Sequence, residues 1–212
     1  MNLQIILIFL FVSVSRCHTA DNTVDYTKYL EYKTTFDSSL TQHFPPHPVV
    51  EKYDVTLHTE PGKNNVWLIL LYSDLNDIIY KSISKDLLSQ ETKAVYDVTD
   101  SCVLFINPFE TSISLDESIM PEIDTSKIDM LCYKGKLPIP NLFNTEKSMF
   151  FKERAIENNF EVFVIDAEPN FKTSSYPMEP NGQMPTDWKN GYSRGFALDS
   201  LNHSVVYWLS IW

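Results

Sequence analysis

Glycine is scarce in this chain, with five occurrences in 212 residues. A phosphate-binding loop needs several glycines close together, because the backbone must approach the phosphate oxygens. The five glycines are scattered, so the sequence excludes a glycine-rich nucleotide site. No other cofactor motif is present, and we expect no cofactor.

Positive charge is also in short supply. Lys and Arg together number 17 against 28 Asp and Glu, for a formal net charge of -11. Affinity for nucleic acid depends on cationic side chains that neutralise phosphates. The balance therefore excludes a nucleic-acid partner, whereas a basic macromolecule would be attracted to the chain.

Metal-binding patterns are missing as well. His43 and His47 are four residues apart, but the two prolines between them break the helix that would align them. The acidic segment from Asp116 to Asp129 lacks the alternating aspartates and central glycine of a calcium-binding EF-hand loop. We predict no metal site and interpret this segment as a solvated loop.

Long apolar runs are limited to Ile5–Val14, which has ten residues. At about 1.5 Å per residue, such a helix covers roughly half of the hydrocarbon core of a bilayer. This length is typical of the centre of a secretory signal peptide. We predict a signal peptide over 1–16 and a polar tether over 17–24, and hence an extracytoplasmic protein.

The end of the leader has two interpretations. Cys17 follows the apolar run and is a candidate for lipidation, which would anchor the protein to a bacterial envelope as a lipoprotein. Alternatively, a signal peptidase cuts after Cys17 or Ala20 and the protein is secreted freely. Arg16 beside the cysteine opposes acylation, whereas the polar residues that follow favour it. A lipid anchor is the only membrane association that the sequence predicts.

Two cysteines remain after the leader, Cys102 and Cys132. In an oxidising compartment they are candidates for a disulfide, which would close a loop of about thirty residues and stabilise the fold by roughly 3 to 4 kcal/mol. The alternative is two buried free thiols. Because no C-x-x-C motif is present, the sequence predicts neither a redox site nor a zinc site.

The hydrophobic pattern predicts one α+β domain over 25–212. Hairpins at both ends of this region indicate a mixed, largely antiparallel sheet of about six or seven strands, packed against about three helices. The expected helices are 25–40, 75–88 and 145–158. The six or seven strands are expected among eight candidate segments: 50–57, 66–72, 94–98, 102–107, 128–133, 160–165, 192–198 and 204–212. Residues 67–71 are apolar on both faces, as in a central strand.

Two patterns raise the possibility of catalysis. Residues 191–195 match the G-x-S-x-G motif of a serine hydrolase, but they precede a strand rather than a helix. A glycine that relieves crowding within a strand is the simpler interpretation. Asp166 and Glu168 form a carboxylate pair of the kind that glycosidases use, and a loop-capping role is the more ordinary interpretation.

Aromatic residues surround a long proline-rich loop at 167–190. Long loops in compact domains are often functional, and aromatic and arginine side chains are enriched at interfaces. The alternative is that the rings hold the loop onto the core. The candidate binding surface comprises Phe171, Tyr176, Trp188, Tyr192, Arg194 and Phe196.

These observations favour a non-catalytic extracytoplasmic module that binds a macromolecule over an enzyme. The first alternative is a small secreted hydrolase with a site built from dispersed residues. The second is an inhibitor or immunity-type protein that binds a basic partner. Separately, residues 202–204 form an N-glycosylation sequon, which is relevant in a eukaryotic host.

Overall fold

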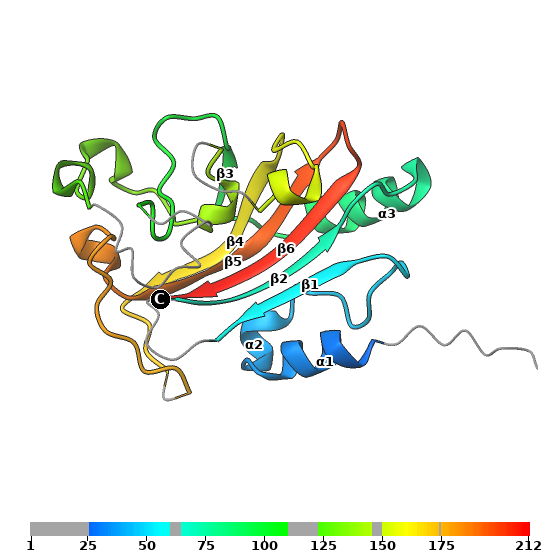
Figure 1. Ribbon diagram of the computed structural model, residues 1–212, viewed down its shortest axis with the longest axis horizontal. Coiled ribbons are helices and arrows are strands. Elements are labelled where there is room, and N and C mark those ends of the chain that lie inside the picture. Colours follow the sequence, from blue (N-terminus) through cyan, green and yellow to red (C-terminus); the bar gives the residue numbers. More distant parts are fainter. Residues whose placement is uncertain (1–25, 60–64, 110–122, 146–149, 174) are drawn as a thin grey trace, which may run out of the picture.

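The computed structural model describes residues 26–59, 65–109, 123–145, 150–173 and 175–212. Six strands form one sheet in the order β1-β2-β6-β5-β4-β3, and every neighbouring pair is antiparallel. The strands are β1 (Asp54–His58), β2 (Val66–Tyr72), β3 (Ala94–Asp97), β4 (Glu161–Pro169), β5 (Gly191–Asp199) and β6 (Ser204–Ile211). The predicted single α+β domain is confirmed (Figure 1).

Both predicted hairpins form: β1-β2 lies at one end of the strand order and β5-β6 lies in the middle of the sheet. β1 and β2 pair directly, and β5 and β6 pair from Tyr192 with Ile211 to Asp199 with Ser204. β2 lies between β1 and β6 and is buried on both faces, which confirms the prediction of a central strand.

Three α-helices are described: α1 (Thr27–Thr34), α2 (Ser38–Thr41) and α3 (Asp77–Leu88). A single helix was expected over 25–40, but Asp37 accepts a hydrogen bond from the backbone N–H of Ser39 and starts a second helix there. α3 begins later than expected, because Asn76 caps it through the backbone N–H of Ile79.

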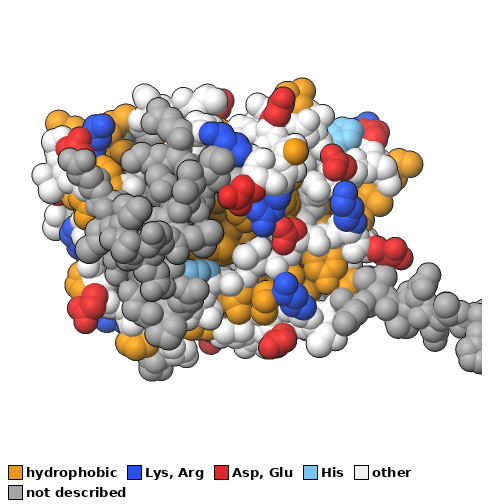
Figure 2. All heavy atoms as spheres, viewed as in Figure 1, with side chains coloured by type: hydrophobic (Ala, Val, Ile, Leu, Met, Phe, Trp, Pro, Cys, Tyr) orange, Lys and Arg blue, Asp and Glu red, His pale blue; other side chains and the backbone are white. Residues whose placement is uncertain are grey.

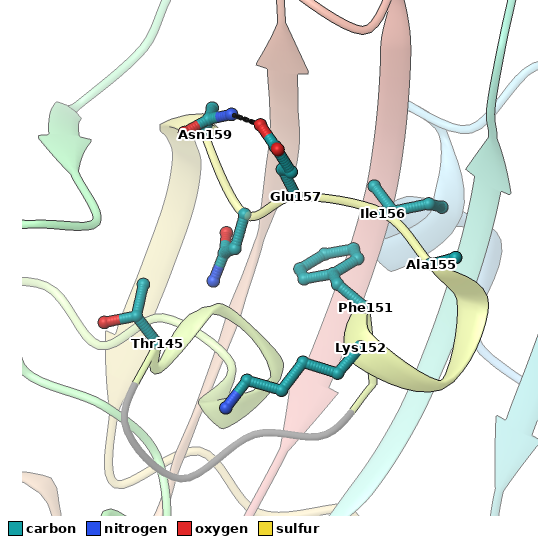
Figure 3. Close-up of a pocket in the computed structure, with 8 residues that line it drawn as sticks. Thr145, Phe151, Lys152, Ala155, Ile156, Glu157 and Asn159 are labelled. Atoms are coloured by element: carbon teal, nitrogen blue, oxygen red, sulfur yellow. Dashed lines mark hydrogen bonds between the residues drawn. The ribbon is translucent and has the colours of Figure 1, made fainter.

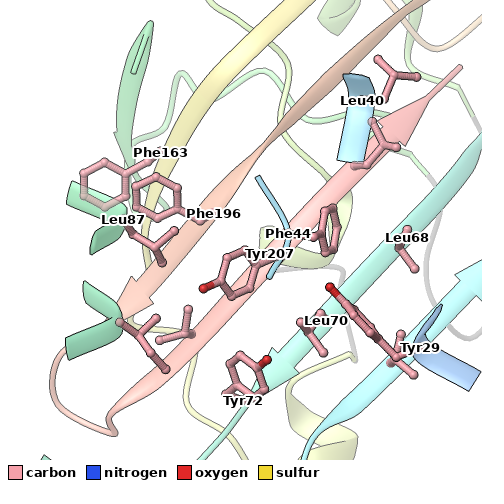
Figure 4. Close-up of a cluster of buried hydrophobic side chains, with 14 of the residues drawn as sticks. Tyr29, Leu40, Phe44, Leu68, Leu70, Tyr72, Leu87, Phe163, Phe196 and Tyr207 are labelled. Carbon is pink, nitrogen blue, oxygen red and sulfur yellow. The ribbon is translucent and has the colours of Figure 1, made fainter. Parts of the chain in front are cut away.

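The three helices cover one face of the sheet. Their apolar side chains meet alternate side chains of the strands, such as Leu70 of β2 and Tyr207 of β6, in one buried cluster (Figure 4). Tyr29 of α1 and Leu87 of α3 belong to the same cluster, whose strand residues extend from Val55 of β1 to Phe163 of β4.

The opposite face is covered by the described parts of segment 98–160, which are 98–109, 123–145 and 150–160. Here a second cluster joins Trp208 of β6 and Val162 of β4 to Phe143 and Phe151 of the segment. Short 3-10 helices replace regular structure at Thr125–Lys127, Leu131–Tyr133, Asn141–Phe143 and Lys152–Arg154, and a further one lies at Thr186–Trp188. We call this covering segment the irregular layer.

Three expectations for the irregular layer are wrong. Residues 102–107 form an isolated parallel bridge between Phe105 and Ile139 instead of a strand. Residues 128–133 contain a 3-10 helix. The described part of 145–158 also contains a 3-10 helix, which ends at Ala155 in the left-handed conformation, with φ 54°. Apolar side chains in these segments fill the second core without a regular period.

Cys102 and Cys132 form a disulfide within the irregular layer. The two residues are 30 positions apart, and their Cα atoms are separated by 5.9 Å. The bond joins the start of the layer to the 3-10 helix Leu131–Tyr133 and closes a long loop.

Gly195 lies where two strands approach each other closely. A Cβ atom at this position would lie 2.0 Å from the carbonyl oxygen of Phe163 and 2.9 Å from the ring of Trp208. A β-bulge between Val164 and Asp166 follows immediately in the neighbouring strand. The glycine of the G-x-S-x-G pattern therefore relieves crowding in the sheet, as the simpler interpretation expected.

The predicted leader lies outside the described residues, and so do Cys17 and the tether; these remain predictions. Within the described ranges, the structure contains no helix that is long and apolar enough to cross a membrane.

Candidate binding pocket

The structure separates the six predicted binding residues into two groups. Tyr192, Arg194 and Phe196 lie on β5 and are buried, with Phe196 completely inaccessible. Phe171, Tyr176 and Trp188 are partly exposed and lie in the loop before β5. The prediction of an exposed surface is therefore wrong for the three residues on β5, because they point into the helical face of the sheet.

The half-exposed residues Phe171 and Tyr176 border a pocket of about 220 Å³. Its floor is formed by the end of β6 at Ile211 and by Trp212. The remaining lining residues are Lys172, Thr173, Pro177, Met178 and Asn190. We call this the aromatic pocket.

The walls of the aromatic pocket are held by specific contacts. The ring of Tyr176 packs 5.6 Å from that of Phe36, and its hydroxyl donates to the carbonyl oxygen of Thr35 at 3.1 Å. Phe171 meets Tyr192 edge to face, with ring centroids 4.8 Å apart. These contacts tie the loop to the residues between α1 and α2 and to β5, so the walls of the pocket are held in place.

The floor is equally well anchored. The indole N–H of Trp212 donates to the carbonyl oxygen of Trp188 at 2.7 Å, and the two rings lie 5.9 Å apart. Trp212 also exchanges backbone hydrogen bonds with Gly191 at 2.9 Å. Trp188, a predicted binding residue, therefore supports the pocket from behind.

A polar network centred on Asp166 lies next to the pocket. Lys93 donates to one carboxylate oxygen at 2.5 Å, and the Tyr192 hydroxyl donates to the other at 2.5 Å. Arg194 lies 3.6 Å from the same carboxylate. Burial alone would raise the pKa of Asp166, but these hydrogen bonds and cations outweigh it and hold the pKa below its ordinary value.

This network has consequences for the carboxylate pair. Because its pKa is lowered, Asp166 stays ionised and is unsuited to donate a proton as a general acid. Burial and the hydrogen bond to Asp166 raise the pKa of Tyr192, which therefore keeps its proton. Glu168 is exposed, and its charge adds to the rise in the pKa of Tyr192. The polar network around Asp166 therefore has a structural role, since it links β4 to β5 and to Lys93.

Arg194 and His43 continue this polar region into the core. Arg194 donates to the carbonyl oxygen of Ser39 in α2 at 3.0 Å, which fastens the helix to β5. His43 lies 3.0 Å from the carbonyl oxygen of Trp208. Burial lowers the pKa of His43 to about 3, so the imidazole is neutral at ordinary pH and its Nε2–H donates this bond.

Ser193 has no nucleophilic role in this geometry. Its side chain is fully buried on the face opposite the helices, and its hydroxyl donates to the carbonyl oxygen of Pro138 at 2.6 Å. The described residues contain no cluster of three or more His, Cys, Asp or Glu arranged for a metal ion. Much of the acidic segment, including Asp116, lies outside the described residues.

A second hollow of about 460 Å³ lies on the irregular layer (Figure 3). Phe151 and Ile156 line it together with the polar residues Lys152 and Glu157. Its other lining residues are Thr145, Ala155, Asn158 and Asn159. Glu157 accepts a hydrogen bond from Asn159 at 3.0 Å, so these two lining residues hold each other in place at the edge of the hollow. Sequence reasoning missed this hollow because its residues lie in the segment expected to be a helix.

Acidic and basic side chains are interspersed over the described surface in Figure 2, with hydrophobic side chains between them. No family model matches the chain, and comparisons with curated proteins and with solved structures give no match. The geometry of the site therefore supplies the functional argument.

Proposed function

We propose that this protein is a non-catalytic extracytoplasmic binding protein whose aromatic pocket receives one apolar side chain of a basic macromolecular partner. The observation that carries the proposal is the pocket itself, with Phe171 and Tyr176 at its border and Trp212 at its floor. Both border residues remain partly exposed although their rings are held in place.

The size of the pocket favours a side chain over a free small molecule. Sites for drug-sized ligands occupy about 300 to 1,000 Å³, whereas this pocket occupies about 220 Å³. In protein interfaces, one aromatic or aliphatic side chain in a well-packed pocket supplies much of the binding energy. A pocket with rigid walls suits this role, since little ordering entropy is lost on binding.

The basic character of the partner follows from the charge of the chain. With a formal net charge of -11, the protein accelerates encounters with cationic proteins and disfavours acidic ones. Such steering weakens as the salt concentration rises. The proposal thus joins an apolar anchor to a salt-dependent approach.

The extracytoplasmic location is supported by two separate features. The apolar run of the leader has the length of a signal peptide, and the disulfide between Cys102 and Cys132 belongs to an oxidising compartment. The intact mass of the protein from its native host distinguishes the two leader interpretations. A diacylglyceryl increment on a chain that begins at Cys17 supports the anchor, and an unmodified chain that begins at His18 or Asp21 contradicts it.

The pocket is tested with single side chains as probes. N-acetyl-tryptophanamide, N-acetyl-leucinamide and N-acetyl-glutamine amide are titrated against the labelled protein, and backbone amide shifts are recorded by NMR. We expect saturable shifts at Asn190 and Ile211 with the two apolar probes and none with the polar probe.

A blocking variant sharpens this test. Thr173→Trp places a large ring at the pocket lining and should weaken apolar probe binding at least tenfold. Leu131→Ala removes an exposed apolar side chain in the irregular layer and should leave it unchanged. Shifts confined to the hollow beside Phe151, or equal binding by Thr173→Trp and the unaltered protein, would contradict the proposal.

A further inference from the structure

The turn between β5 and β6 contains the sequon Asn202-His203-Ser204. The last pair of the hairpin joins Asp199 to Ser204, so Asn202 lies in the four-residue turn that projects beyond the sheet. We propose that Asn202 carries an N-linked glycan in the secreted form of the protein.

The hydrogen bonds of the turn are compatible with this modification. The buried carboxylate of Asp199 accepts from the backbone N–H groups of Leu201 at 2.9 Å and Asn202 at 3.0 Å. It also accepts from Nδ2 of Asn202 at 2.7 Å. An asparagine amide nitrogen has two hydrogens. A glycan replaces one of them, and the other is enough to keep the contact with Asp199.

Exposed apolar side chains lie on the turn and on the adjoining start of α3, and the one on the turn supplies an independent reason for a glycan. Leu201 is 78% exposed and Ile78, in the first turn of α3, is 81% exposed. The start of α3 is fixed beside the turn, because Leu75 donates to the carbonyl oxygen of His203 at 3.1 Å and Tyr80 stacks on the ring of His203 at 4.9 Å. A hydrophilic glycan on Asn202 shields Leu201, its neighbour in the turn, from other proteins.

The transfer itself precedes folding of the hairpin. Ser204 is 1% exposed in the folded protein, so the acceptor sequon is accessible only before β5 and β6 pair. The donor is a polyprenyl diphosphate-linked oligosaccharide of the secretory membrane. A bond forms between Nδ2 and the sugar C1, the bond from C1 to the phosphate oxygen breaks, and the amide proton leaves as the diphosphate departs.

The glycan leaves the aromatic pocket open. Asn202 lies just before β6, whereas the pocket lies at its far end near Ile211. Eight strand residues at about 3.4 Å each separate the two sites by roughly 25 Å. The glycan and the proposed partner are therefore independent, and each can fail without the other.

The test expresses the full chain with its own leader in a eukaryotic secretory host. Intact mass is measured before and after treatment with peptide-N-glycosidase, on protein from the medium and from the secretory compartments. We expect one N-glycan, removed by the enzyme and mapped by peptide mass spectrometry to Asn202. Unmodified protein with the disulfide formed, from either fraction, would overturn the proposal, as would a glycan elsewhere.

Ser204→Ala is the matched control. It destroys the sequon but keeps Asn202 and its contacts with Asp199, and we expect it to carry no glycan. Shielding is measured separately by the fluorescence of a hydrophobic dye. Trimming the glycan to one N-acetylglucosamine should raise dye binding at least twofold, and Leu201→Ser should abolish the rise. A rise that persists in Leu201→Ser would contradict the shielding role.

Discussion

The two faces of the sheet are covered in different ways. On the helical face, α1 to α3 contribute apolar side chains to the core, and the longest of them, α3, has regularly repeating backbone hydrogen bonds over twelve residues. On the other face, the irregular layer depends on individual side-chain contacts. The Tyr96 hydroxyl accepts from the backbone N–H of Leu137 at 2.8 Å, and Asn158 donates to the carbonyl oxygen of Phe143 at 2.9 Å.

This comparison shows where cross-links matter. A layer without repeating hydrogen bonds loses its arrangement when single contacts fail, whereas a helix tolerates the loss of one contact more easily. The disulfide lies on the irregular side, where it reduces the freedom of the unfolded chain. Both faces nevertheless share the same strands, so a defect in the sheet affects them together.

The largest effect is expected from Gly195→Val, because the added carbons collide with the backbone of Phe163. We expect both faces to lose stability together, by at least about 3 kcal/mol, measured by urea unfolding followed by circular dichroism. Gly182→Ala is the control, since nothing lies within 4 Å of its added carbon. A Gly195→Val protein that unfolds at the same urea concentration as the unaltered protein would contradict the close strand approach.

Removal of the disulfide should destabilise the irregular layer more than the helical face. The double variant Cys102→Ser, Cys132→Ser is expected to lose about 3.5 kcal/mol, from the entropy of a loop of this length. Hydrogen exchange should show lost protection in the irregular layer, while the amides of α3 keep theirs. An equal loss of protection in α3 at low denaturant would show that the two layers unfold as one unit.

Acid should act on the helical face through His43. Its folded pKa of about 3 lies below its ordinary value of 6.5, so stability is complete above pH 6.5 and falls as the pH drops toward 3. At pH 5 the loss is about 2 kcal/mol. His43→Leu should flatten the dependence of unfolding free energy on pH between 6.5 and 4.5. An unchanged slope would mean that other groups cause the acid sensitivity.

The smallest effect is expected for Arg154→Gln. Arg154 pairs with Asp54 at 2.6 Å and thereby links the irregular layer to β1, but both side chains are partly exposed. Such pairs contribute less than about 1 kcal/mol. Thermal unfolding in low and high salt measures the loss, with the helix pair of Lys81 and Asp77 as the reference through Lys81→Gln. A loss of unfolding free energy above 2 kcal/mol would contradict this expectation and show that the Arg154–Asp54 pair is important for joining the irregular layer to β1.

The regular half of the molecule could be predicted from the sequence. The apolar runs of β1, β2, β5 and β6 and the spacing of apolar residues in α3 are local signals, and the structure confirms these elements. The irregular layer could not be predicted, because residues such as Phe143 and Phe151 are buried by contacts with distant strands. The apolar residues of this layer are evident in the sequence, but their spacing does not identify the irregular structure. They therefore led to the prediction of one helix and two strands that do not form.

The candidate site could be predicted only in part. The aromatic loop was recognised, and Phe171 and Tyr176 do border the pocket. The burial of Phe196 and Arg194 was missed, because the composition of a strand does not show which of its faces is covered. The two-residue side-chain repeat of a strand could have indicated this burial. Residues 192, 194, 196 and 198 share one face of β5, so Tyr192, Arg194 and Phe196 must point to the same side of the sheet.

The position of β6 in the sheet has a consequence for biogenesis. β6 lies between β2 and β5, yet it is the last of the six strands to leave the ribosome. Until it emerges, the earlier strands expose unpaired edges and apolar faces, which favour aggregation and chaperone binding. Completion of the sheet is therefore a late step, because β6 joins the pair β1-β2 to the three strands β5, β4 and β3.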